Sequence, residues 1–120
     1  RAVIDAFGAQ VERAPMAHCA LLLAVDFVLG PSFEVVIAGK RDADDVKAMA
    51  AAVESVYQPN RVTVFRPQEG AEDVMRMASY TKEQVALEGG RATAYVCRDF
   101  ACHRPTTDAA EMLKLLSGSG

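Results

Sequence analysis

The sequence of 120 residues contains no tryptophan, and aromatic residues make up only 7% of it. A hydrophobic core without tryptophan has to be built from Val, Leu, Ile, Ala and Met. Hydrophobic residues nevertheless account for 51% and charged residues for 24% of the chain. This composition is ordinary for a folded protein and excludes global disorder. The length suits a single domain with one core.

Positive charge is also scarce. Lys and Arg number 13 against 16 Asp and Glu, the net charge is −3, and the longest Lys/Arg run is the pair Lys40-Arg41. A protein that binds nucleic acid or an anionic membrane needs a positive surface, because its affinity comes largely from neutralising phosphate. We therefore expect no nucleic acid and no membrane among the partners.

Long apolar runs and cysteines are few. The longest apolar stretch, 16–29, is interrupted by His18 and Asp26 and is shorter than the ~20 residues of a membrane-spanning helix. The three cysteines are an odd number, which argues against a secreted disulfide framework and favours a reducing compartment. We expect the chain to be cytoplasmic.

Helical periodicity dominates the first 30 residues. Apolar residues recur at helical spacing over 2–14, Pro15 interrupts the pattern, and 16–29 reads as a second helix that Gly30-Pro31 ends. This second helix is apolar on almost every side, so we expect it to be covered on both sides, with Cys19 inert in a core. The sequence starts at Arg1 inside an amphipathic pattern, and we expect it to be a piece of a larger protein.

From residue 34 onward, strand-forming runs alternate with helical patterns. The runs 34–38, 61–65 and 92–97 predict three strands, with 34–38 in the centre because it is the most uniformly apolar. Strand and helix repeated three times predict an α/β fold: a small parallel sheet of three or slightly more strands, with helices on both faces. We expect three parts: a helical segment 1–30, an α/β domain 31–117 and a flexible tail 118–120.

The helical patterns between the strands give further expectations. Asp42 is the expected N-cap of a helix whose apolar stripe runs to Tyr57. A helix is expected near 71–79, and 80–88 fits an extension of that helix, a loop or a short helix. The last helix is expected to start at Thr107 or Asp108, with Met112, Leu113 and Leu116 directed inward.

One candidate site lies at Gly39-Lys40-Arg41, after the expected central strand. Ligands of open α/β sheets bind beyond the carboxyl ends of strands, often at helix N-termini, and Arg66 and Arg98 leave the two neighbouring strands. A small anion or a nucleotide would suit such a cluster. Against this, the sequence has no glycine-rich phosphate motif, and Asp42, Asp44 and Asp45 would repel a phosphate.

A second candidate site is Cys97-x4-Cys102-His103. The two cysteines fit a disulfide, structural or redox-active, if a hairpin brings their Cα atoms to about 5.5 Å. They also fit two small side chains packed under a turn. A zinc site would need four ligands, and Cys19 or His18 would have to join from far away. The sequence leaves these alternatives open.

Other chemistry has weaker support. His18 and Cys19 are adjacent, and adjacent helical side chains point about 100° apart, so they make a poor base and nucleophile. Helix capping accounts for the carboxylates at helix starts. We expect no cofactor, no metal and no catalytic activity from this chain itself.

The segment 92–108, which reads Ala-Thr-Ala-Tyr-Val-Cys-Arg-Asp-Phe-Ala-Cys-His-Arg-Pro-Thr-Thr-Asp, is distinctive. It resembles the C-terminal signature of the thioredoxin-domain-containing proteins related to spermatogenesis-associated protein 20. Chains of that family finish with a Tyr-Val-Cys strand, a second Cys five residues later, a Pro, a Thr-Asp cap and one helix. The runs 34–39 and 57–60 are similar to other stretches of that region, so the resemblance covers about residues 15 to 116.

The resemblance implies a parent protein with a thioredoxin-like domain and an (α/α)6 barrel similar to six-hairpin glycosidases. This chain would be a non-catalytic accessory domain packed on that barrel, and its exposed 1–30 segment would self-associate in isolation. The alternatives are redox exchange of Cys97 and Cys102 with the thioredoxin-like domain, and anion binding at 39–42. The parent's Cys-x-x-Cys is absent here, and His103 stands where the family more often has Gln.

Overall fold

The computed structural model describes residues 1–87 and 89–118. The chain divides into two compact units, Arg1–Ser32 and Phe33–Gly120. Of the tail expected at 118–120, the last two residues lie outside the described part of the chain.

The first unit is helical, as its periodicity predicts. It consists of α1 (Ala2–Arg13), the 3-10 helix η1 (Pro15–His18) and α2 (Cys19–Leu29). Pro15 begins η1, where its missing N–H is not needed. Gly30 follows α2 with a positive φ of 72°, a conformation that glycine adopts without strain.

The second unit contains four strands and three α-helices among the described residues. Its elements are β1 (Phe33–Gly39), α3 (Asp44–Glu54), β2 (Arg61–Pro67), α4 (Glu72–Met77), the 3-10 helix η2 (Ser79–Glu83), β3 (Thr93–Arg98), β4 (Ala101–Cys102) and α5 (Ala109–Leu116).

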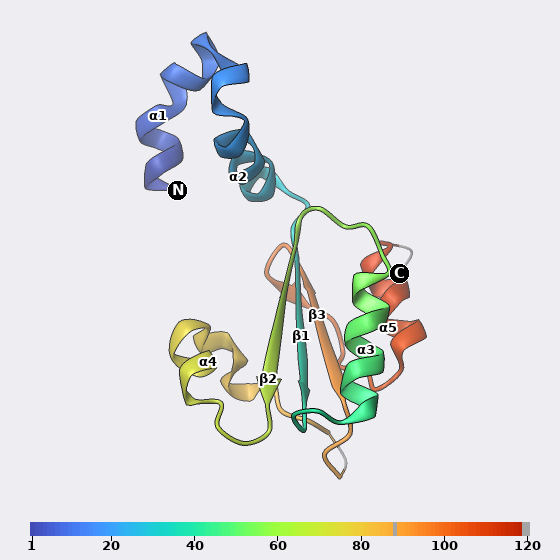
Figure 1. Cartoon of the computed structure of the whole chain (residues 1–120). Coiled ribbons are helices and arrows are strands. Elements are labelled where there is room, and N and C mark those ends of the chain that lie inside the picture. The colour runs from blue at the N-terminus through green and yellow to red at the C-terminus, as the bar shows by residue number, and fades with distance from the viewer. Residues whose placement is uncertain (88, 119–120) are drawn as a thin grey trace. The chain divides into compact units, whose positions relative to one another are not determined.

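The strands form one sheet in the order β2-β1-β3-β4, so the apolar β1 is internal, as predicted (Figure 1). The prediction of a purely parallel sheet is wrong. β1 and β2 are parallel, whereas β3 runs antiparallel to β1, and β4 antiparallel to β3.

The direction of β3 follows from the path of the connection that precedes it, residues 68–92, rather than from its length. A crossover to a parallel strand must travel the length of the sheet, about 23 Å for a seven-residue strand. Helix α4 has six residues and is about 9 Å long. The connection instead leaves β2 at Pro67, opposite Gly39, and enters β3 at Thr93, opposite Ala38, so both ends lie at the same end of the sheet.

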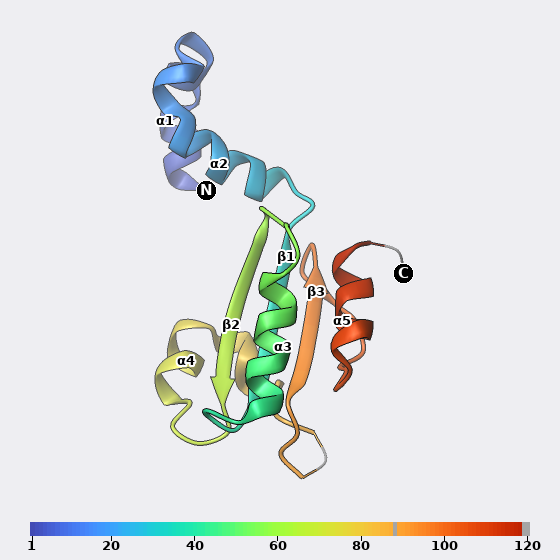
Figure 2. The same ribbon diagram turned by 45° about the vertical axis from the view of Figure 1, so that its right-hand side comes forward.

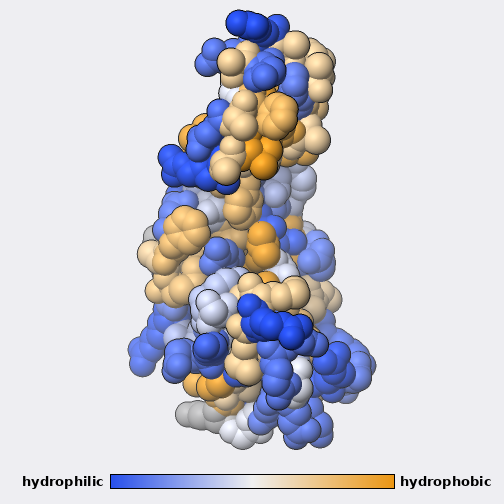
Figure 3. Space-filling view, turned by 90° about the vertical axis from the view of Figure 1, so that its left-hand side faces the viewer, coloured by the Kyte–Doolittle hydropathy of each residue, from blue (hydrophilic) through white to orange (hydrophobic). Residues whose placement is uncertain are grey.

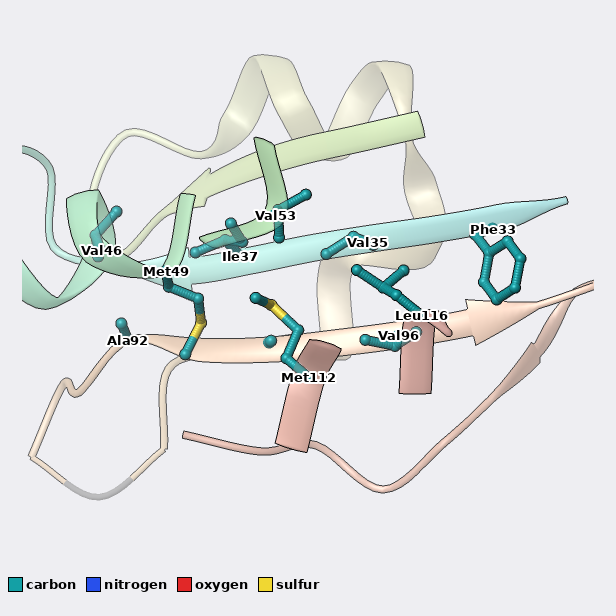
Figure 4. Packing of buried hydrophobic residues seen from close by; sticks show 11 residues of the cluster. Phe33, Val35, Ile37, Val46, Met49, Val53, Ala92, Val96, Met112 and Leu116 are labelled. Carbon is teal, nitrogen blue, oxygen red and sulfur yellow. The ribbon is translucent and has the colours of Figure 1, made fainter. Parts of the chain in front are cut away.

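The core lies between the sheet and two helices. Figures 1 and 2 show α3 and α5 on one face of the sheet. The buried side chains there come from strands and helices alike (Figure 4): Phe33, Val35, Ile37, Val46, Met49, Val53, Ala92, Ala94, Val96, Met112 and Leu116. As the composition requires, this core is aliphatic apart from one phenylalanine.

On the other face, η2 is tied to β2 by a buried arginine. The Nε of Arg66 donates a 2.8 Å hydrogen bond to the carbonyl of Thr81, and both residues are buried. The segment 80–88, left open by the sequence, therefore begins as a short helix held by a side chain of β2.

Three local expectations are wrong. Asp42 is not the N-cap of α3, because Ala43 holds that position and Asp42 lies in the preceding turn with a φ of 65°. Tyr57 is 91% exposed, since α3 ends at Glu54, before the stripe reaches it. Cys19 is exposed rather than inert in a core.

Candidate functional site

The most distinctive chemical feature of the α/β unit is a disulfide between Cys97 and Cys102. The two residues face each other across β3 and β4, and their Cα atoms are 3.8 Å apart. The tight turn between them has positive φ values at Asp99 and Phe100. Of the alternatives that the sequence left open, the structure therefore shows the disulfide.

The two cysteines differ in exposure. Cys97 is only 1% exposed, whereas Cys102 is exposed. Side chains alternate along a strand, and Ala94 and Val96 point into the core with α3 and α5. Cys97 therefore points to the opposite sheet face, the face of η2. An incoming thiolate would reach Cys102 and displace Cys97 as the leaving group.

Gln84, at the end of η2, lies beside the disulfide. Its Nε2 is 4.0 Å from the Sγ of Cys102, within reach of a weak N–H···S hydrogen bond. The residue is buried, and its Oε1 has no hydrogen-bond partner among the described residues. No motif singles out this glutamine, because it falls in the segment whose structure the sequence left open.

Polar groups flank the same face of the sheet. Glu34 is the register partner of Cys97 across β1 and β3. Burial, and then the negative charge of Glu34, raises the pKa of the Tyr80 phenol. Burial also raises the pKa of Tyr95, whose hydroxyl donates a 2.7 Å hydrogen bond to the Val85 carbonyl. Both phenols are therefore neutral at physiological pH, and that of Tyr95 serves as a donor.

His103 follows the disulfide but is exposed, and its backbone N–H donates to the carbonyl of Val96. Within residues 1–87 and 89–118, no three His, Cys, Asp or Glu side chains come together to hold a metal ion. Two of the ligands considered for zinc, Cys97 and Cys102, are bonded to each other instead.

At the other end of β1, Lys40 and Arg41 line a surface pocket of about 520 Å³ together with Gln68, Glu69 and Gly89. The acidic Glu69 beside the two cations works against an anion. The guanidinium of Arg41 lies 5.9 Å from the ring of Phe65, at cation–π distance.

The other arginines considered for this pocket point elsewhere. Arg66 is buried against η2. Arg98 is the register partner of Phe33, at the far end of β1 from Gly39, because β3 is antiparallel. Its guanidinium lies 5.7 Å from the Phe33 ring. The positive cluster expected from a parallel sheet is therefore not assembled.

The start of α3 already carries its own anion. The carboxylate of Asp45 accepts hydrogen bonds from the backbone N–H of Val46 at 2.9 Å and of Ala92 at 2.7 Å. The bond from Ala92 is the main cause that lowers the pKa of Asp45 below its ordinary 3.8. This carboxylate links α3 to the start of β3 and competes with any exogenous anion there.

In the helical unit, the adjacent His18 and Cys19 do not form a catalytic pair. The ring Nδ1 of His18 lies 2.9 Å from the carbonyl of Ala14, and the thiol of Cys19 donates to the carbonyl of Met16. Each side chain thus bonds to its own preceding turn.

The sequence aligns with curated proteins across nearly its whole length. Spermatogenesis-associated protein 20 of human is 34% identical over 114 residues, which cover 95% of this chain. The rat and mouse proteins of the same name are 30% and 29% identical over the same length. The chain is homologous to a region of spermatogenesis-associated protein 20.

The aligned region is 14% of the length of each of these relatives. The homology to spermatogenesis-associated protein 20 therefore indicates a domain of a larger protein. No protein-family model and no solved structure matches the chain. Among the described residues, no helix has the length and apolar character needed to cross a membrane.

Proposed function

We propose that this chain is a non-catalytic accessory domain that docks onto a larger protein through its helical unit. The observation that carries the proposal is the exposure of the apolar helix α2. All eleven of its residues except Asp26 are apolar, and none is buried. Figure 3 shows hydrophobic side chains gathered on the surface of this unit, at the top of the view.

The exposed side chains make solvation of α2 unfavourable. Leu23 is 73% and Leu29 is 79% exposed, and burial of one such leucine contributes about 1.5–3 kcal/mol. Large apolar patches on soluble proteins mark interaction sites. Contact with another protein surface would therefore stabilise this helix substantially.

The partner that we propose is the remaining part of a longer polypeptide, because the curated relatives are about seven times longer than the aligned region. The sequence resemblance favours a helical barrel, with a thioredoxin-like domain nearby, in a reducing and therefore cytoplasmic setting. An almost uniformly apolar helix suits such a site, since helices of this kind are covered on both sides.

The test is binding in trans. The 120-residue chain and the remainder of the longer protein are prepared separately, and their affinity is measured by calorimetry. Leu23→Glu places a charge in the proposed interface and should weaken binding at least about a hundredfold. Gln10→Glu adds the same charge at an exposed position of α1 and should change the affinity less than about threefold. Equal affinities for the two variants would rule out docking through α2.

A second function, reversible dithiol–disulfide exchange, is supported by the bond between Cys97 and Cys102. In a reducing compartment, disulfides are usually transient and redox-active. The exposure of Cys102 gives a partner dithiol access to one sulfur. The thioredoxin-like domain implied by the resemblance would supply that dithiol.

This function predicts that the folded chain exchanges with glutathione. At equilibrium with mixed reduced and oxidised glutathione, the fraction of Cys97–Cys102 disulfide should change across the physiological range of potentials. Thiol alkylation followed by mass spectrometry measures that fraction. A pair that stays fully oxidised, or fully reduced, at every physiological ratio would refute the redox role without affecting the docking proposal.

A further inference from the structure

The two polar atoms of the Gln84 side-chain amide differ in their hydrogen bonding. Its side chain is 7% exposed, its Nε2 lies 4.0 Å from the Sγ of Cys102, and its Oε1 has no partner within the described part of the chain. A buried acceptor without a donor is unfavourable, because its interaction with water is lost and nothing replaces it. The oxidised state therefore leaves this amide only half satisfied.

The disulfide cannot supply the missing donor. A disulfide sulfur carries no hydrogen, whereas a reduced cysteine has an S–H that donates weakly and a thiolate that accepts. Rotation of the amide by 180° exchanges Oε1 and Nε2, so it would bring the oxygen to the position now 4.0 Å from Cys102. One amide can thus accept from the Cys102 thiol or donate to its thiolate.

We propose that Gln84 is a positioning residue that stabilises the reduced form of the Cys97–Cys102 pair. This inference rests on the second function proposed above and specifies how that site is regulated. Because an N–H donates a stronger hydrogen bond to a negatively charged thiolate than to a neutral disulfide sulfur, the amide shifts the equilibrium toward the reduced pair. It also favours ionisation of Cys102, the exposed cysteine of the pair.

The exchange balances with a dithiol as the reductant. One thiolate of the reductant attacks the Sγ of Cys102, the bond to Cys97 breaks, and Cys97 leaves with the electron pair and takes up a proton. The second thiolate of the reductant then attacks its own sulfur in the mixed disulfide and releases Cys102. Two electrons and two protons pass to the chain, and the reductant becomes a disulfide.

The first experiment compares Gln84→Met with wild type at equilibrium with glutathione. Methionine fills a similar volume and has no N–H to donate to the sulfur. The equilibrium should shift toward the disulfide by about tenfold, which corresponds to about 30 mV for a two-electron couple. Gln68→Met, the same change at an exposed position, should leave the equilibrium unchanged.

The second experiment measures how the alkylation rate of reduced Cys102 depends on pH. Gln84→Leu removes the amide N–H without placing a charge beside the sulfur. It should raise the pH at half-maximal rate by about one unit. A glutamine that only fills space would produce no such change, so this readout decides the question even if Gln84→Met does not fold.

The outcomes separate the two proposals. If the wild-type disulfide exchanges with glutathione but neither variant shifts the equilibrium or the pH profile, the role of Gln84 is refuted and the redox function stands. A wild-type pair that does not exchange removes the redox function and this inference together.

Discussion

At the scale of single residues, one hydrogen bond and one close approach hold the corner of the domain where β1 ends and β3 begins. Asp45 joins the first turn of α3 to the backbone of Ala92, just before β3. Gly39 ends β1 where that turn packs against it. A Cβ at Gly39 would lie 2.5 Å from the Cγ2 of Val46 and 3.4 Å from the Cα of Ala92. Both residues therefore hold the same corner of the domain.

Asp45→Ala should lower the free energy of unfolding by about 1 kcal/mol at pH 7, since two hydrogen bonds to a solvent-accessible carboxylate are lost. The pKa of Asp45 is lowered in the folded protein, so its contribution is present above the unfolded pKa and is lost as pH falls through the folded value. The difference between wild type and variant should therefore shrink below about pH 3.8. Urea titrations at several pH values measure it. Asp44→Ala is the control, and an equal loss there would contradict a specific role for Asp45.

Gly39→Ala should destabilise the chain by about 2 kcal/mol, because the added methyl overlaps Val46 and the nearby backbone cannot move freely. Gly8→Ala provides a matched control: nothing lies within 4 Å of a Cβ at that helical position. It should leave stability unchanged or raise it by about 0.5–1 kcal/mol. Thermal unfolding of both variants tests the pair, and a neutral Gly39→Ala would be inconsistent with the close packing.

At the scale of elements, most helices and strands could be predicted from periodicity, but the direction of β3 could not. A run such as 92–97 indicates a strand without indicating its orientation. The orientation depends on whether the preceding connection crosses the sheet, and that depends on α4 ending at Met77 and η2 following it. Nothing in the apolar pattern of 71–88 shows this division.

Tertiary packing likewise decides which site residues could be predicted from the sequence. Cys97 and Cys102 could be nominated from their spacing, and their proximity follows from a hairpin. Gln84 is eighteen residues from Cys102 and meets it only because η2 is fixed to the sheet. A parallel sheet predicts Arg66 and Arg98 near Lys40, but the antiparallel β3 carries Arg98 to the far end of β1 and Arg66 is buried against η2.

Arg66 is the residue that fixes η2, so its loss should affect this element more than the sheet. Arg66→Met leaves the buried carbonyl of Thr81 without its 2.8 Å hydrogen bond and should cost about 2 kcal/mol. Hydrogen exchange should accelerate in 79–84 but much less in β1. Arg76→Met removes only an exposed ion pair with Asp73 and should cost less than about 0.5 kcal/mol. Uniform acceleration across the sheet would argue against a local anchor.

At the scale of the whole molecule, the two units differ in how far they bury their apolar residues. The unit 33–120 has its own core of buried side chains. The helices α1 and α2 contain no buried residue. This contrast is the physical basis for docking, because a helix as apolar as α2 needs a covering surface.

The central claim, that α2 is covered in the longer protein, can be tested with one reporter cysteine. Cys19→Ala removes the exposed thiol, and Leu23→Cys places a single reactive thiol on α2. Its alkylation rate is then compared between the 120-residue chain and the longer protein, with Cys97 and Cys102 oxidised. The docking account predicts a rate at least about tenfold slower in the longer protein. Equal rates in the two molecules would contradict it.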